Sequence, residues 1–261
     1  MIDLHAHILP GIDDGPPDIA GSMDFARAAA AQGTTVLAAT PHLRNDYPLV
    51  DVYRLGDWCA DLTARLPVDL NLEVVPASEV DLMWAQDATD EELRLASFGQ
   101  RGTDLLLETP YGLIPDNFEE LLFNVSVRGY RVLLAHPERN QTFQRDPERL
   151  KRIADRGVLI QITLPSVLAR DKSSRSRKLA FDLVREGIAH NLASDSHSSG
   201  RFRPPLLRAA ARAFDEFAPS YAQWMVTEAP AAILAGAPMP RPPRVDAPKN
   251  KRGLRLPGFG R

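Results

Sequence analysis

The sequence predicts an α/β protein in which seven parallel strands alternate with helices and form a closed or nearly closed barrel. Three observations lead to this fold class: short apolar runs alternate with amphipathic segments, glycines separate helices from the strands that follow, and ionisable side chains gather where strands end. The 261 residues suit a single α/β barrel domain, which typically needs about 250. An open doubly wound sheet has the same alternation, so the pattern alone leaves that alternative open.

The strands are predicted from seven apolar runs, at residues 1–5, 34–42, 71–79, 103–110, 130–137, 157–163 and 188–197. Helices are predicted between them, near residues 18–32, 49–65, 90–98, 116–128, 147–156 and 173–186, and helical segments follow at 204–216 and 220–235. Helix start signals include Asp116 and the pair Asp146-Pro147. A glycine separates helix from strand at four junctions, namely Gly33, Gly129, Gly157 and Gly187.

The composition excludes several classes of protein. A net charge of −3 argues against a general nucleic-acid binder. The single cysteine, Cys59, allows neither an intramolecular disulfide nor a thiolate zinc site. No signal-like segment precedes the first strand and no apolar run reaches about 18 residues, so we expect no stable membrane insertion and a cytoplasmic protein.

The opening stretch MIDLHAHILPGIDDG, residues 1–15, places His5 and His7 at the end of the first strand. Alternate residues of a strand share a face, so both imidazoles can point the same way. The Pro–Gly loop that follows can return Asp13 or Asp14 towards them. Imidazole and carboxylate are common ligands of Mn, Fe and Zn, although an isolated H-x-H is often one buried and one exposed histidine.

The ends of the other strands favour the metal site. His42, Glu79, Glu108 and His136 end strands two to five, and the seventh strand ends on Asp195 and His197. Active sites of parallel α/β barrels lie at these carboxyl ends. Five of the six histidines fall there, and we interpret the sixth, His190, as structural or surface.

The segments DLHAHILPGIDDG, TPH, HPER and SDSH, in this order and spacing, resemble the PHP (polymerase and histidinol phosphatase) superfamily. The stretches DLHAHILPGIDDGPPD and GSMDFARAAAAQGTTVLAATPH are especially similar to the PHP-type protein-tyrosine phosphatases of bacterial capsule and exopolysaccharide operons. The resemblance covers residues 1 to about 237. It implies a distorted, TIM-like (β/α)7 barrel and a single metallophosphatase domain over residues 1–240.

The resemblance implies three divalent metal ions, often manganese, with iron or zinc also possible. One ion would be held by His5, His7, Glu79 and Asp195. A second would be held by Glu79, Glu108 and His136, with Glu79 bridging. The third would be held by Asp14, His42 and His197, with Asp13 as the alternative to Asp14.

Two arginines are implied as phosphate ligands, because guanidinium groups bind phosphate bidentately. Arg139 lies three residues after His136 and precedes Asn140, where the family commonly has tyrosine. In the family the second arginine precedes a proline soon after the SDxH motif. Arg203 is followed by Pro204, which favours Arg203 as the second arginine. Arg201 is the alternative, since this loop is one residue longer than usual.

These implied features predict a metal-dependent protein-tyrosine phosphatase that hydrolyses phosphotyrosine by a metal-bound hydroxide. The resemblance implies as partner the phosphorylated tyrosine-rich tail of a bacterial tyrosine autokinase that regulates capsular or exopolysaccharide biosynthesis. The alternatives are a PHP phosphatase for a small phosphomonoester, such as histidinol phosphate, and a metal-dependent phosphodiesterase or nuclease.

Two further segments bear on these predictions. Residues 59–65 read C-x5-R, the motif of cysteine-dependent tyrosine phosphatases, but apolar spacing places Cys59 inside a helix and no glycine lies between Cys59 and Arg65. We therefore expect no thiol mechanism. Residues 241–261 hold seven Lys or Arg against one Asp, with many Pro and Gly, and this basic tail is expected to be disordered or loosely laid on the surface.

Overall fold

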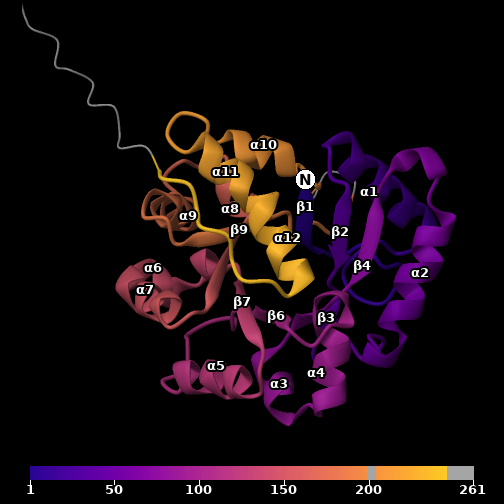
Figure 1. Cartoon of the computed structure of the whole chain (residues 1–261), viewed down its shortest axis with the longest axis horizontal. Helices are drawn as coiled ribbons and strands as arrows, with labels where there is room; N and C mark the ends of the chain where they lie inside the picture. The colour runs from indigo at the N-terminus through magenta and orange to yellow at the C-terminus, as the bar shows by residue number, and fades with distance from the viewer. Residues whose placement is uncertain (199–203, 246–261) are drawn as a thin grey trace, which may run out of the picture.

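The computed structural model describes residues 1–198 and 204–245. In Figure 1 the strands occupy the middle of the view and the helices surround them. Most of the predicted tail, residues 246–261, lies outside the described residues. No helix in the described ranges is both long enough and apolar enough to cross a membrane.

The strands form two parallel sheets. The first has the order β1-β2-β4, from Ile2–Ala6, Val36–Ala39 and Glu73–Pro76. The second has the order β3-β5-β6-β7-β8-β9, from His42–Leu43, Glu79–Val80, Asp104–Glu108, Arg131–Ala135, Leu159–Thr163 and Ala189–Ala193. Every strand pair in the described ranges is parallel, as strand–helix alternation predicts.

Two of the seven predicted strands are each interrupted. Residues 34–42 become β2 and β3, because Pro41 has no N–H and the Thr40 hydroxyl accepts from Ala6 N at 3.0 Å. Residues 71–79 become β4 and β5. Hydrogen bonds continue across both breaks, from Ala77 N to Ala39 O (3.0 Å) and from Glu79 N to Pro41 O (3.1 Å).

The sheets also approach each other at β1 and β9. A single parallel bridge joins Ala6 to Ser196, and Asp195 N donates to His5 O at 2.8 Å. Over the described residues neither sheet closes on itself. The strand order therefore establishes an α/β fold built on parallel sheets.

The longer helices occur where amphipathic segments predict them. They are α1 (Ile19–Ala31), α2 (Leu55–Arg65), α4 (Asp90–Ala96), α5 (Phe118–Val127), α7 (Pro147–Asp155) and α9 (Arg175–Arg185). Short 3-10 turns also occur: η1 (Val52–Arg54), η2 (Val68–Leu70), η3 (Phe98–Gln100) and η4 (Pro137–Arg139). The Asp146-Pro147 signal is confirmed, since Asp146 accepts from Arg149 N at 3.1 Å.

Other helices differ from the prediction. The structure adds α3 (Leu82–Asp87), α6 (Gln141–Arg145) and α8 (Leu164–Val167), each too short to show a helical period in sequence. The predicted segment 204–216 contains only α10 (Leu207–Arg212), and 220–235 divides into α11 (Pro219–Met225) and α12 (Glu228–Ala235).

An inner apolar cluster fills the space between the strands. It combines strand side chains with Phe98 of η3 and Ile233 of α12, and the strand members include Leu4, Ala38, Leu106, Leu133 and Leu159. Helix α12 contacts β1 and β9 and lies over the strands in Figure 1. Consecutive side chains of a strand point to opposite faces, so Leu4 joins this cluster while His5 turns to the site described below.

His190 is interpreted above as structural or surface, and its contacts show a structural role. Its Nδ1 accepts from Ile160 N at 3.1 Å, and burial lowers its pKa from 6.5 to about 4. The unfolded chain therefore binds more protons between pH 6.5 and 4, so this group's contribution to stability is complete above pH 6.5 and is lost as the pH falls.

We expect wild-type protein to lose about 2 kcal/mol more unfolding free energy between pH 7 and 5 than a His190→Asn variant, which keeps an acceptor but does not titrate. Urea unfolding at both pH values measures the difference. Taking that difference cancels the titration of the other histidines, which both proteins share. Equal pH dependence in the two proteins would contradict the assignment.

Candidate metal centre

Eight of the nine predicted metal ligands fall into three overlapping groups at the carboxyl ends of the strands. The groups are His5, His7, Glu79 and Asp195; His7, Asp14, His42 and His197; and His42, Glu79 and Glu108. In each group, one ligand atom per residue lies within 4.8 Å of the others. The structure thus brings together side chains that are up to 192 residues apart, from His5 to His197.

The first group is completely buried and has the membership that the resemblance implied. His5 Nε2 lies 3.1 Å from Glu79 Oε2 and 3.4 Å from Asp195 Oδ1. His7 Nε2 lies 3.4 Å from the same Glu79 oxygen and 3.3 Å from His5 Nε2. Two imidazole nitrogens and two carboxylates therefore converge on one point.

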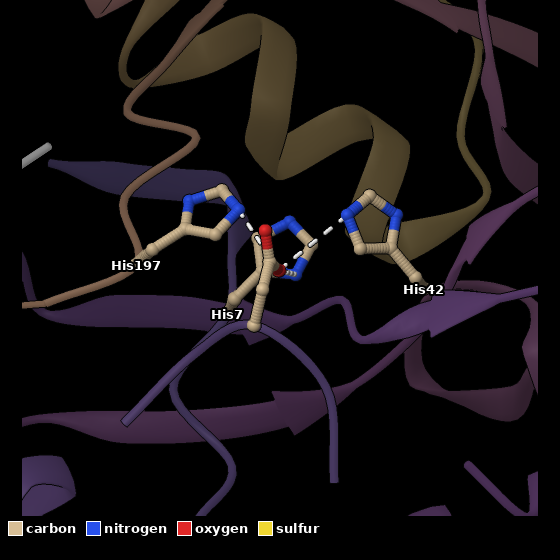
Figure 2. Close-up of side chains that lie close together, drawn as sticks. His7, His42 and His197 are labelled. Carbon is tan, nitrogen blue, oxygen red and sulfur yellow. Dashed lines mark ion pairs between the residues drawn. The ribbon is translucent and has the colours of Figure 1, made fainter. Parts of the chain in front are cut away.

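The group around Asp14 is more open. Figure 2 shows His7, His42 and His197 facing one another. Asp14 Oδ1 lies 3.1 Å from His197 Nε2 and 3.6 Å from His42 Nε2, and its side chain is 43% exposed. Asp13 instead accepts from His7 Nδ1 at 2.7 Å, which leaves Nε2 of that ring for the first group. The structure therefore places Asp14, rather than Asp13, among the candidate ligands.

Glu79 links the groups. Its Oε2 lies 3.1 Å from His42 Nδ1, and its Oε1 lies 2.7 Å from His136 Nε2. His136 belongs to none of the three groups, whereas the resemblance implied that it joins Glu79 and Glu108. In this arrangement His42 joins that pair, and the His136 ring is hydrogen-bonded to Oε1 of Glu79.

The pKa values of the cluster follow from burial and close charges. Burial acts to raise the pKa of Glu79, but His5 and His136 outweigh it and hold this pKa well below its usual range. Burial, with the negative charge of Glu79, raises the pKa of Glu108 to about 7. Burial, with positive charge on His7, lowers the pKa of His42 to about 4.

The buried nitrogen and oxygen atoms of the cluster suit divalent cations. Glu79 Oε2 and His42 Nδ1 are buried and make no hydrogen bond within the described residues, although they lie 3.1 Å apart. Such groups are costly to bury unless a ligand satisfies them. Nitrogen and oxygen donors without thiolate suit Mn or Fe and tolerate Zn. The residues present therefore fit metal ions.

The backbone at two strand ends is strained. His136 follows β7 with φ 40°, and Asp195 follows β9 with φ 47°, both in the left-handed region that residues other than glycine seldom adopt. Such strain is typical of functional positions. At His136 it begins the η4 turn, in which Arg139 N donates to His136 O at 3.0 Å, so Arg139 returns over the cluster.

Arg139 lies at the rim of the centre with 28% of its side chain exposed. Its Nη2 donates to Thr163 Oγ1 at 2.9 Å and also to Asp195. Burial acts to lower its pKa, but the Asp195 and Glu138 carboxylates outweigh it, so the pKa of Arg139 is raised and the group stays charged. The other predicted arginine, Arg203, and its alternative Arg201 lie outside the described residues.

Sequence reasoning missed the support beneath His5. Gln161 of β8 accepts from His5 Nδ1 at 2.7 Å and donates to Asn191 Oδ1 at 3.0 Å, and Asn191 donates to Met225 O at 3.1 Å. This series of hydrogen bonds holds the His5 proton on Nδ1 and leaves Nε2 free to bind metal. The signal was a glutamine within the apolar run VLIQIT.

We expect Gln161→Leu to weaken metal affinity by about 10- to 100-fold, because His5 loses the acceptor that orients its ring. Competition with a chromogenic chelator measures the affinity. Asn191→Ala is the matched control, since it removes the hydrogen bonds beyond Gln161 and leaves the contact between Gln161 and His5 in place. If both variants lose metal affinity equally, the effect is one of general stability and the orienting role is wrong.

Cys59 has no part in this centre. It is buried in α2, and burial raises the pKa of its thiol to about 12. Arg65 is paired with Asp61 at 2.9 Å on the exposed side of the same helix. The prediction that C-x5-R is not a phosphate-binding loop is confirmed, because its residues lie inside one helix.

Parallel strands whose carboxyl ends collect histidines and carboxylates define a metal-binding α/β protein. The family described as "Capsular polysaccharide synthesis, CpsB/CapC" matches residues 1–235, and the chain belongs to it. The predicted resemblance to capsule-type PHP phosphatases is thereby confirmed.

Named relatives agree with this membership. The chain is 33% identical to tyrosine-protein phosphatase YwqE of Bacillus subtilis over 76% of this chain and 78% of the relative. It is 28% identical to tyrosine-protein phosphatase CpsB of Streptococcus agalactiae over 80% and 88%. A solved structure, reported for YwqE of Bacillus subtilis and CpsB of Streptococcus pneumoniae as metal-dependent tyrosine phosphatases, superimposes with a TM-score of 0.80 at 30% identity, covering 95% of this chain and 100% of the other.

Proposed function

We propose that this chain is a metal-dependent protein-tyrosine phosphatase. One observation carries the proposal: Glu79 is buried among four imidazoles, with Arg139 at the rim of the same cluster. Its relatives are named tyrosine-protein phosphatases, and the matched structure is described as metal-dependent. Cation-binding groups beside a guanidinium are the combination that phosphoryl transfer requires.

We propose that the nine predicted ligands, at the strand ends and at Asp14 in the loop after β1, hold three divalent ions, with manganese preferred. The three groups described above support this number. When bound, such ions lower the pKa of water and neutralise charge on phosphate oxygens. Glu79 contributes to two of the groups and would bridge two ions.

The chain's own residues position the substrate. Arg139 presents a fixed fork to phosphate oxygens, because Thr163 and Asp195 hold its guanidinium. Asp13 and Gln161 fix the tautomers of His7 and His5. A tyrosyl leaving group has a pKa near 10, so its departure needs little help from a general acid.

The scaffold of this enzyme is proposed as one PHP domain over residues 1–240 that closes into a distorted seven-stranded barrel. The Ala6–Ser196 bridge, the hydrogen bonds across the breaks in the second and third predicted strands, and the shared inner cluster support this closure. Closure would bring every ligand-bearing strand end to one mouth.

The biological substrate that we propose is the phosphorylated, tyrosine-rich tail of a tyrosine autokinase that regulates capsule or exopolysaccharide synthesis. The enzyme would act on this tail in the cytoplasm. The family description, which names capsular polysaccharide synthesis, supports this role. The open side of the centre near Asp14 supports a flexible peptide as substrate.

Chelation tests the proposal. We expect EDTA to abolish hydrolysis of a phosphotyrosine peptide, Mn²⁺ to restore it, and thiol alkylation to leave it intact, because Cys59 is buried and not ionised. Histidinol phosphate and a phosphodiester, assayed in parallel, serve as competing substrates. Faster turnover of either one, or activity that survives chelation, would overturn the proposal.

A further inference from the structure

A cavity of about 150 Å³ opens beside two residues of the centre, His136 and Arg139. Its other walls come from residues 109–112, in the loop after β6, and from Asn140 and Gln141 after η4. A cavity of about this volume is large enough to bind benzene. The cavity therefore has room for one aromatic ring next to the proposed phosphate-binding arginine.

The loop that forms this wall is held in place by Asn140. Its Nδ2 donates to Pro110 O at 2.8 Å and to Gly112 O at 2.9 Å, while its Oδ1 accepts from Thr142 N at 2.8 Å. Gly112 has φ 83°, which a residue with a Cβ adopts only with strain. The two carbonyl contacts fix the residue between them, Tyr111.

Tyr111 is 73% exposed, although it is a large aromatic residue. Its ring centre lies 5.2 Å from the Arg44 guanidinium carbon. Arg44 in turn pairs with Glu108 at 3.1 Å. Arg44 therefore links the Tyr111 ring to Glu108 of the centre, while Tyr111 also lines the cavity.

We propose that this cavity is the aryl subsite of the enzyme, in which the substrate's tyrosyl ring lies against Tyr111 and Pro110 while its phosphoryl group lies at Arg139. This inference rests on the proposed phosphatase function and assigns the residues that select aryl over alkyl phosphates. Offset packing of two aromatic rings contributes favourable energy that an alkyl group cannot reproduce.

Calorimetric binding of two phosphonates to the Mn²⁺-loaded protein tests the subsite. Phenylphosphonate and methylphosphonate share the charged group and differ in the ring. We expect wild-type protein to bind the phenyl compound more tightly, and Tyr111→Ala to weaken that binding by about 3- to 10-fold while methylphosphonate binding is unchanged. Tyr111→Phe keeps the ring and should keep the preference.

Two more variants separate the subsite from general effects. Asn140→Ser keeps an N-cap acceptor for α6 but loses both carbonyl contacts, and it should reduce the phenyl preference as Tyr111→Ala does. Tyr53→Ala, which removes another exposed tyrosine (59%) on η1, should change neither affinity.

The outcomes distinguish this inference from the proposed function. Equal affinity of wild-type protein for both phosphonates, or equal losses for both in Tyr111→Ala, would overturn the subsite even if aryl phosphates are hydrolysed. Absence of phosphatase turnover would overturn the proposed function, and the phosphonate affinities would still decide the subsite, because their binding requires no reaction.

Discussion

Glu79→Gln is expected to lose bound metal and phosphatase activity together. The substitution removes one negative charge from a buried site where four histidines, His5, His7, His42 and His136, converge on the carboxylate. A neutral amide is a weaker ligand and also turns an N–H₂ group towards a metal or an imidazole. Substitutions that only support a ligand cost 10–100-fold, so we expect a loss of more than about 100-fold here.

Metal analysis by mass spectrometry beside steady-state kinetics measures both effects. Glu73→Gln is the matched control, because Glu73 is an exposed glutamate on β4. The control should keep its full metal content and turnover. A normal metal count in Glu79→Gln would show that Glu79 does not bridge ions.

Arg139→Ala is expected to keep its metal and to lose about 10²- to 10³-fold in phosphotyrosine turnover. Removing one fixed donor to a developing oxyanion typically has this effect. Metal should remain because Asp195, the carboxylate that Arg139 contacts, also lies 3.4 Å from His5 and 3.6 Å from His7. Inorganic phosphate should bind more weakly as a product inhibitor.

Two further variants define the role of this arginine. Arg139→Lys keeps the charge without the bidentate fork and should restore part of the activity. Arg145→Ala removes an exposed arginine of α6 and should leave kinetics unchanged. If Arg139→Ala loses as much metal as Glu79→Gln, then the arginine supports Asp195 and does not act on phosphate.

Much of this protein was predictable from local patterns. Each predicted strand exists, because apolar runs bounded by glycine and helix caps are short-range signals that act within a few residues. The candidate ligands were predictable for a related reason: ionisable residues that follow buried strands must meet where parallel strands end. The helical position of Cys59 followed from its apolar spacing alone.

Loop paths were beyond sequence reasoning. Asp13 and Asp14 are adjacent and chemically identical, and only the fold shows that Asp13 holds His7 while Asp14 faces His42 and His197. The short helices α3, α6 and α8 also escaped prediction, because one or two turns carry too few residues to show a period.

The sequence by itself determined the parallel α/β class. It also determined which strand each candidate ligand follows and which residue types these ligands are, since both depend on residue type and spacing. Tertiary structure alone decided which partners meet: Gln161 beneath His5, His42 beside Glu79 and Glu108, and Tyr111 at the cavity held by Asn140. Those contacts depend on strand register, on the left-handed turns at His136 and Asp195 and on the paths of loops. Each of these is set by packing between residues far apart in the chain, which no local pattern encodes.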